Sequence, residues 1–260
     1  MAPRRPLPAA PGVLQRLLLA ASCLAAAVSA KSSLLDTSAV AHGMIIDAGS
    51  GGSRLHVFRW GSRQFDSAPP PISYPFSNND WCNRLRPGIS SYADHPQDVG
   101  QSLKPLVDFA KTILKDHEED WHKYPIYLRA TAGMRQLEPT KRVAVLDAIR
   151  DYLGGPECPF HFEYHYVRVL AGEEEGVYGW AAVNFLRGDL LPSSDGAGTA
   201  ASASTVGALD MGGASTQISF FRPDQDIMSN LFKLQIGSQK HWNVYTHSFL
   251  GFGEAAMRMR

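Results

Sequence analysis

One short pattern occurs twice in this chain and constrains its fold more than any other feature. The two copies are Asp47–Ser53 and Asp210–Ser215. Each copy begins with an Asp that ends a short apolar run. The copy then turns through small residues that include a serine, and alternating apolar and polar residues follow it. The pattern therefore predicts two β-hairpins of the same form, one in each half of the chain.

Both predicted turns have a composition suited to phosphate. Glycine lets a phosphate approach backbone N–H groups, because no side chain blocks the way. The glycines are Gly49, Gly51, Gly52, Gly212 and Gly213, and the hydroxyl donors are Ser50, Ser53 and Ser215. Either turn alone could be only a tight hairpin. Two such turns, each preceded by a carboxylate, indicate a site that binds phosphate from two sides.

The two aspartates, Asp47 and Asp210, stand where apolar strands end. A buried carboxylate is costly without a partner, and a divalent cation such as Ca²⁺ or Mg²⁺ would supply one. The alternative is that each aspartate caps its own turn. That alternative is plausible for either residue and awkward for both.

A third acidic group follows the apolar run at residues 167–170. The segment Glu173–Gly176 stands at a predicted strand-to-helix junction, and Glu175 is the candidate general base for hydrolysis of a phosphoanhydride. Favourable interaction with a helix N-terminus accounts equally well for Glu173 or Glu174. Ser215 could hold the attacking water, and Thr131 offers a further hydroxyl unless it is only structural.

Strands and helices alternate along the rest of the chain, which indicates an α/β architecture. Long loops are expected at residues 67–91, with five prolines, and at residues 187–205, rich in Ser, Ala and Gly. We expect strands at residues 44–46, 55–60, 126–128, 167–170, 207–210 and 216–221, and helices at 98–115, 140–152, from 172 through 185, and from 254.

Charge and the N-terminus limit the kinds of function. The chain has 25 basic and 25 acidic side chains, which argues against general nucleic-acid binding. Residues 1–30 have basic, apolar and small-residue segments in the order of a secretory signal peptide; an uncleaved signal anchor is the alternative. We therefore expect the secretory pathway: secreted, at the cell surface, or in the lumen of the Golgi or endoplasmic reticulum. There Cys82 and Cys158 could pair, although their spacing is weak evidence for a disulfide.

Four segments together resemble the apyrases, the ecto-nucleoside triphosphate diphosphohydrolases. The resemblance covers about residues 43–260, and a fifth segment, Tyr245–Leu250, is also family-like. The four segments are Asp47–Arg54, Ala130–Arg135, Gly172–Trp180 and Asp210–Gln217.

The resemblance implies an actin-like (ribonuclease H-like) α/β fold of two lobes that hydrolyses nucleoside tri- or diphosphates by direct attack of water. It places the first lobe at residues 31–170 and the start of an incomplete second lobe at residues 171–260. Glu175 matches the family's catalytic base, and Ser215 the serine that holds the water. By the resemblance, the phosphate loops consist of Ser50, Gly51, Gly52 and Ser53 with Gly213 and Ala214. The residues around a metal, held mostly through water, are Asp47, Asp210, Thr131 and Gln217.

Two other interpretations stay open. An exopolyphosphatase or a kinase of the same actin-like superfamily would share the paired loops. A shortened chain, ending where the family's second lobe continues, could instead bind nucleotide without hydrolysing it, or gain a membrane anchor only in a longer form. Base preference, the choice between tri- and diphosphate, and oligomeric state are not predicted by the sequence.

Overall fold

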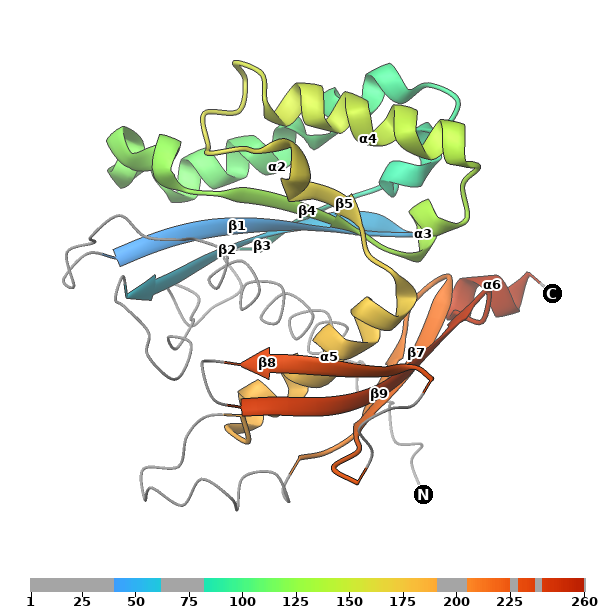
Figure 1. Cartoon of the computed structure of the whole chain (residues 1–260). Coiled ribbons are helices and arrows are strands. Elements are labelled where there is room, and N and C mark those ends of the chain that lie inside the picture. The colour runs from blue at the N-terminus through green and yellow to red at the C-terminus, as the bar shows by residue number, and fades with distance from the viewer. Residues whose placement is uncertain (1–39, 62–81, 191–204, 225–228, 237–239, 260) are drawn as a thin grey trace, which may run out of the picture.

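The computed structural model describes residues 40–61, 82–190, 205–224, 229–236 and 240–259. The predicted signal peptide at residues 1–30 lies outside the described residues, and so do residues 67–81 and 191–204 of the two predicted loops. The rest forms two α/β lobes, each built on one sheet, and the chain passes from the first to the second where β5 leads into α5 (Figure 1). Within the described ranges, no helix combines the length and apolar character needed to cross a bilayer.

The first sheet begins with the first of the two predicted hairpins. Strands β1 (Val40–Gly49) and β2 (Gly52–Gly61) pair antiparallel, with Asp47 opposite Arg54. Strand β3 (Cys82–Leu85) pairs antiparallel to β2 at one edge. Strands β4 (Ile126–Ala130) and β5 (Val167–Val169) add parallel strands on the other side of β1, which gives the order β3-β2-β1-β4-β5.

Two amphipathic helices cover one face of this sheet (Figure 1). They are α2 (Val99–Ile113) and α4 (Pro139–Leu153), and both were expected from helical spacing of apolar residues. Their buried faces join inward side chains of β1, β2 and β4 in one apolar cluster. Short helices connect the elements: α3 (Ala132–Arg135) after β4, and the 3₁₀ turns η2 (Ile89–Tyr92), η3 (Pro96–Asp98), η4 (Lys115–Lys123) and η5 (Tyr164–Tyr166).

The second sheet is antiparallel throughout and contains the second predicted hairpin. Strands β6 (Ala208–Met211) and β7 (Ser215–Phe221) form that hairpin, and β9 (Lys240–Leu250) and β8 (Leu231–Ile236) extend it in the order β6-β7-β9-β8. Helix α5 (Gly172–Arg187) packs across one face of this sheet (Figure 1).

The packing of α5 is apolar at one end and polar at the other. At the apolar end, the Trp180 ring lies 5.7 Å from Trp242 and 6.4 Å from Phe221, centroid to centroid. Towards the helix N-terminus, the side chains of β7 that face α5 are polar: Ser215, Gln217 and Ser219 are buried, while Phe220 points outward. The chain continues beyond β9 into α6 (Glu254–Arg258), the helix start expected from residue 254.

Three strands were not predicted. Strand β3 lies within the segment 67–91 that was expected to be a loop, so that expectation is wrong for Cys82–Leu85. This four-residue strand has no apolar run and forms because the edge of β2 offers free backbone partners. Strands β8 and β9 were also missed. In β9 the inward row changes from Trp242 and Val244 to Thr246, so the alternation of apolar and polar residues fades along the strand.

Candidate active site

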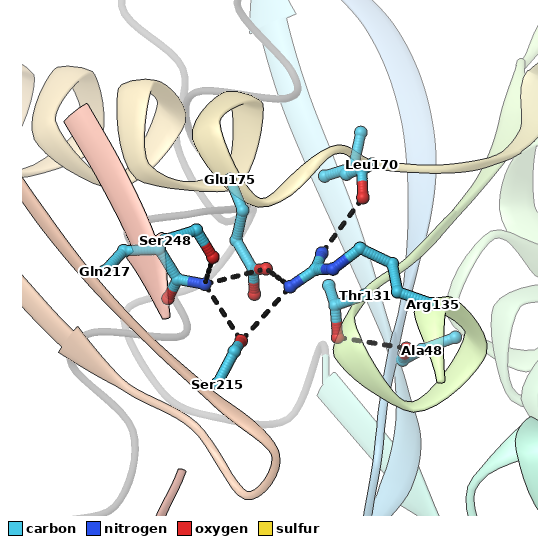
Figure 2. A network of polar contacts seen from close by, with 8 residues as sticks. All are labelled: Ala48, Thr131, Arg135, Leu170, Glu175, Ser215, Gln217 and Ser248. Carbon is cyan, nitrogen blue, oxygen red and sulfur yellow. Dashed lines mark hydrogen bonds and ion pairs between the residues drawn. The ribbon is translucent and has the colours of Figure 1, made fainter. Parts of the chain in front are cut away.

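A cluster of polar side chains joins the two lobes close to both hairpin turns (Figure 2). Arg135, at the end of α3 in the first lobe, reaches Glu175 on the first turn of α5 and Ser215 at the start of β7. Gln217 lies two residues further along β7 and contacts the same two side chains. Sequence segments far apart in the chain are therefore brought together here.

Arg135 is the donor at the centre of this cluster. One terminal nitrogen, Nη2, donates to Glu175 Oε2 at 2.8 Å and to Ser215 Oγ at 3.1 Å. The other, Nη1, donates to the carbonyl oxygen of Leu170 at 2.9 Å, in the segment that connects the lobes. The side chains of Arg135 and Glu175 are only 13% and 9% exposed, so this ion pair is largely shielded from water.

Gln217 supplies the second set of hydrogen bonds. Its Nε2 lies 2.9 Å from Ser215 Oγ, 3.3 Å from Glu175 Oε2 and 3.0 Å from Ser248 Oγ on β9. Among the described residues, the hydrogen bonds to Glu175 from Arg135 and Gln217 therefore both end on Oε2. The carboxylate is held at one oxygen, which leaves Oε1 as the oxygen able to take a proton.

The environment of Glu175 gives it the acidity of a general base near neutral pH. Burial raises the pKa of Glu175 to about 7, while the charge and the hydrogen bond of Arg135 oppose that rise. The negative charges of Asp210 and Asp47 raise the pKa of Glu175 further. A base whose pKa is close to the working pH is the arrangement that proton transfer favours.

The two repeated aspartates share this electronegative region. Burial raises the pKa of Asp210 to about 6, and the charge of Asp47 adds to the effect. Burial also raises the pKa of Asp47, which is 7% exposed and accepts a hydrogen bond from Arg54 Nη1 at 3.3 Å. The carboxyl groups of Glu175, Asp47 and Asp210 repel one another in a poorly solvated region. In the described part of the chain, arginines lie beside only Glu175 and Asp47, so the region suits a hard divalent cation.

Direct coordination of that cation by a cluster of side chains is not seen. In the part of the chain that the structure describes, no three His, Cys, Asp or Glu residues lie close enough to form a metal site. Two carboxyl groups, those of Asp47 and Asp210, suit a cation that keeps several of its own waters, as Mg²⁺ commonly does. Thr131 lies beside this region, because its backbone N–H donates to the carbonyl oxygen of Ala48 at 3.1 Å, and its Oγ1 is 3.5 Å from the same oxygen (Figure 2).

The two hairpin turns approach each other at Ser50. A Cβ added at Gly213 would lie 2.6 Å from Ser50 Oγ, so the second turn is in contact with the tip of the first. Gly133 and Gly88 enclose Ser50 from other sides: an added Cβ would lie 2.9 Å from Ser50 Cα and 2.6 Å from Ser50 O, respectively. Glycine is needed at these positions because the backbone of the first turn occupies the space a side chain would need.

The other predicted phosphate ligands differ in their accessibility. Gly51 is exposed, with open space where a side chain would lie. Gly52 has a φ of +157°, and a Cβ there would lie 2.4 Å from the carbonyl oxygen of Leu85 on β3. Ser53 is buried, and its hydroxyl has no hydrogen-bond partner among the described residues. Ala214 is buried, and its carbonyl oxygen accepts from the N–H of Gly251.

Sequence reasoning assigned no role to Arg135, Arg54 or Ser248, although all three contact predicted site residues. All three lie in segments quoted for the resemblance, Asp47–Arg54, Ala130–Arg135 and Tyr245–Leu250, and that was the available signal. Glu174 forms a separate pair away from the cluster: its carboxylate accepts from Arg168 Nη1 at 3.0 Å and from Tyr178 Oη at 2.8 Å. Cys82 and Cys158 are both free thiols, so they do not form the disulfide that was left open.

Comparison with known proteins supports the resemblance over the same part of the chain. The Golgi apyrase of Saccharomyces cerevisiae is 35% identical over 242 residues, which cover 84% of this chain and 37% of the yeast protein. The human protein named nucleoside diphosphate phosphatase ENTPD5 is 32% identical, over 84% of this chain and 48% of its own length. The chain thus spans about half, or less, of the length of these relatives.

A solved structure agrees with this fold. The crystal structure of a nucleoside triphosphate hydrolase from Neospora caninum superposes with a TM-score of 0.57 at 20% identity, over 92% of this chain and 49% of that one. The expected actin-like α/β fold is confirmed. The model of the GDA1/CD39 (nucleoside phosphatase) family matches residues 33–260. The chain belongs to the GDA1/CD39 nucleoside phosphatase family.

Proposed function

We propose that this chain hydrolyses nucleoside tri- or diphosphates to the lower phosphate and orthophosphate. The observation that carries the proposal is the buried Arg135–Glu175 pair, which brings a carboxylate with a pKa of about 7 to Ser215 beside the two glycine turns. Phosphoryl transfer depends on positioning and on electrostatic stabilisation, and this cluster offers both. The names of the relatives, apyrase and nucleoside diphosphate phosphatase, support the substrate class.

In this proposal, Glu175 is the general base. A water held between Ser215 Oγ and Glu175 attacks the terminal phosphorus, and Oε1 of Glu175 takes the proton of that water. The new phosphorus–oxygen bond forms as the bond to the bridging oxygen breaks. The leaving phosphate keeps the electron pair, and orthophosphate is the other product. Gln217 and Arg135 hold Oε2, so the carboxylate cannot turn away from the water.

The two turns would bind the phosphate chain. We assign this role to backbone N–H groups and hydroxyls in both turns: Ser50, Gly51, Gly52, Ser53, Gly213 and Ala214. The contact between Ser50 and Gly213 supports the assignment, because a group bound at one turn is also close to the other. The hydroxyl of Ser53, which has no partner among the residues that the structure describes, is a donor that a phosphate or a water could satisfy.

A divalent cation, Ca²⁺ or Mg²⁺, would be held near Asp47 and Asp210 mostly through water, with Thr131 and Gln217 completing its surroundings. Burial raises the pKa of both aspartates, and Arg54 offsets only part of that rise at Asp47, which supports a cation beside them. When bound, the cation supplies neutralisation of phosphate charge. We further propose that the protein works in the lumen of the secretory pathway, from the leader-like residues 1–30 and the relative named for the Golgi.

The test is phosphate release by the 260-residue chain from ATP, ADP, GDP, UDP and inorganic polyphosphate, each with Ca²⁺ or Mg²⁺. We expect release from nucleotides, its loss in excess EDTA, and its return when either cation is restored. Glu175→Gln keeps the size of the side chain and removes the base, so it should lower kcat by at least about 100-fold. Release from polyphosphate alone would overturn the proposed substrate class, and full activity of Glu175→Gln would overturn the assigned base.

A further inference from the structure

Ser248 lies one strand behind the proposed catalytic cluster and contacts it through a single side chain. It stands opposite Gln217 in the pairing of β7 with β9, and its Oγ accepts a hydrogen bond from Gln217 Nε2 at 3.0 Å. Figure 2 shows the hydroxyls of Ser248 and Ser215 on opposite sides of the Gln217 amide nitrogen. Gln217 is therefore held between Ser248 on one side and the pair of Ser215 and Glu175 on the other.

The same serine also supports the helix that carries Glu175. A Cβ added at Gly172 would lie 2.2 Å from Ser248 Oγ and 2.4 Å from Ser248 Cβ, so the backbone of the first turn of α5 rests directly on this side chain. One turn later, a Cβ at Gly176 would lie 2.1 Å from Thr246 Oγ1. Glu175 lies between Gly172 and Gly176 in the helix, so these two contacts fix the distance of Glu175 from the sheet.

The geometry of the Gln217 amide explains why Ser248 matters to the site. The amide nitrogen has two hydrogens, whereas three acceptors surround it: Ser215 Oγ, Glu175 Oε2 and Ser248 Oγ. The terminal torsion of a glutamine is broad, so few contacts fix the plane of its amide. With Ser248 present, one hydrogen is drawn towards β9 and the other is left for Ser215 and Glu175.

We propose that Ser248 is a positioning residue for the hydrolytic reaction: it fixes the Gln217 amide and the first turn of α5, so that Gln217, Ser215 and Glu175 converge on one water. This inference rests on the proposed function. Ser248 does not touch the water itself. Its effect is transmitted by the hydrogen bond to Gln217 and by the contact with Gly172.

The chain contains a matched control for this role. Ser219 and Thr246 also form a buried hydroxyl pair between β7 and β9, with 2.7 Å between Ser219 Oγ and Thr246 Oγ1, and they also support α5. Neither residue hydrogen-bonds to Gln217 or Glu175 among the contacts of the described residues. Removing the Ser219 hydroxyl therefore perturbs the same packing without releasing the amide.

The experiment compares Ser248→Ala and Ser219→Ala in the 260-residue chain by steady-state phosphate release from a nucleoside diphosphate with Mg²⁺. A lost or misdirected hydrogen bond of this kind corresponds to a roughly 10- to 100-fold lower kcat, and we expect that fall in Ser248→Ala with KM changed less than about twofold. Ser248→Cys, which keeps a slightly larger group beneath Gly172 and a weaker acceptor, should lie between Ser248→Ala and the unmodified chain. Ser219→Ala should keep kcat within about twofold.

A second measurement separates this inference from the proposed function. The side-chain amide of Gln217 is followed by ¹⁵N–¹H correlation NMR in the uniformly labelled chain. We expect Ser248→Ala to move these two signals towards solvent-exposed values and Ser219→Ala to leave them in place. Absence of phosphate release by the unmodified chain would overturn the proposed function while the amide signals still report on positioning. Unmoved signals in Ser248→Ala, or an equal loss of kcat in Ser219→Ala, would overturn the role of Ser248.

Discussion

Replacing Arg135 by methionine should move the pH at which the enzyme becomes active. The carboxylate of Glu175 is buried, and Arg135 Nη2 donates to it at 2.8 Å, so the substitution removes the positive partner of an ionised group. A hydrogen bond to a charged group contributes roughly 1.5–3 kcal/mol, which corresponds to roughly one to two pKa units. The pKa of Glu175, about 7 with Arg135 present, should therefore rise to about 8 or 9.

The sign of the effect follows from the proposed role of Glu175 as a base. Only the deprotonated form accepts the proton of water, so kcat/KM rises with pH through the pKa of Glu175 in the free enzyme. At pH 7 about half of the unmodified protein carries ionised Glu175, whereas the variant would carry about 1 to 10%. We expect kcat/KM at pH 7 to fall about 5- to 50-fold, with much of the loss recovered by pH 9.

The assay is kcat/KM for phosphate release at saturating Mg²⁺ from pH 5.5 to 9.5, with thermal unfolding measured in parallel. Arg168→Met is the control, because it also breaks an arginine–glutamate pair at the junction of the lobes but leaves Glu175 untouched. In Arg168→Met, the rise of kcat/KM on the acidic side of the pH profile should coincide with that of the unmodified protein. A uniform loss at every pH in Arg135→Met, with this rise unmoved, would refute the reasoning.

Three further variants test other features. Burial lowers the pKa of His42 to about 4 from 6.5, so the unfolded chain binds the extra proton between these values and the contribution of His42 to stability should fall by about 2 kcal/mol from pH 7.5 to pH 5. The raised pKa values of Glu175 and Asp210 act in the opposite direction, so the share of His42 is read in urea unfolding as the difference in pH dependence between the unmodified chain and His42→Phe. Gly213→Ala should displace the hydroxyl of Ser50 and raise KM for nucleotide roughly tenfold with little change in Tm. An unchanged KM would show that the contact between the two turns does not contribute to nucleotide binding. Gly176→Ala should lower the free energy of unfolding by about 2 kcal/mol through its clash with the hydroxyls of Thr246 and Ser219. Adding Thr246→Ala should restore part of that loss, and no recovery in the double variant would show that Thr246 is not the source of the clash.

Local patterns were sufficient to predict helices α2, α4, α5 and α6 and both hairpins, but not the short helix α3. The helical spacing in α2 and α4 and the Asp-to-glycine turns are properties of short segments, and the structure has them where expected. Strand β9 was missed because its inward row becomes polar at Thr246, where it meets the glycine face of α5. The polar residues that break the strand pattern in the sequence are the same residues whose hydroxyls lie beneath the first turns of α5, which carry Glu175.

The site was predictable only in part, for a related reason. Glu175 and Ser215 stand in motifs that the resemblance singled out, so the sequence was enough to propose roles for them. Arg135 acquires its place through contacts with residues 40 and 80 positions away in the chain. No periodicity or spacing records such contacts, because they depend on how two separately formed lobes meet. The same holds for Ser248, which belongs to the sheet and touches the site through Gln217.

The enclosure of Ser50 has a consequence for how the protein folds. Gly88 precedes η2, Gly133 lies in α3 and Gly213 lies in the second hairpin, so three separate segments meet one serine. The tip of the first turn cannot be fully shaped until the last of these segments has arrived, although β1 and β2 pair locally. We expect phosphate-binding competence to be a late event in folding, acquired when the second hairpin docks and not when the first lobe forms its sheet.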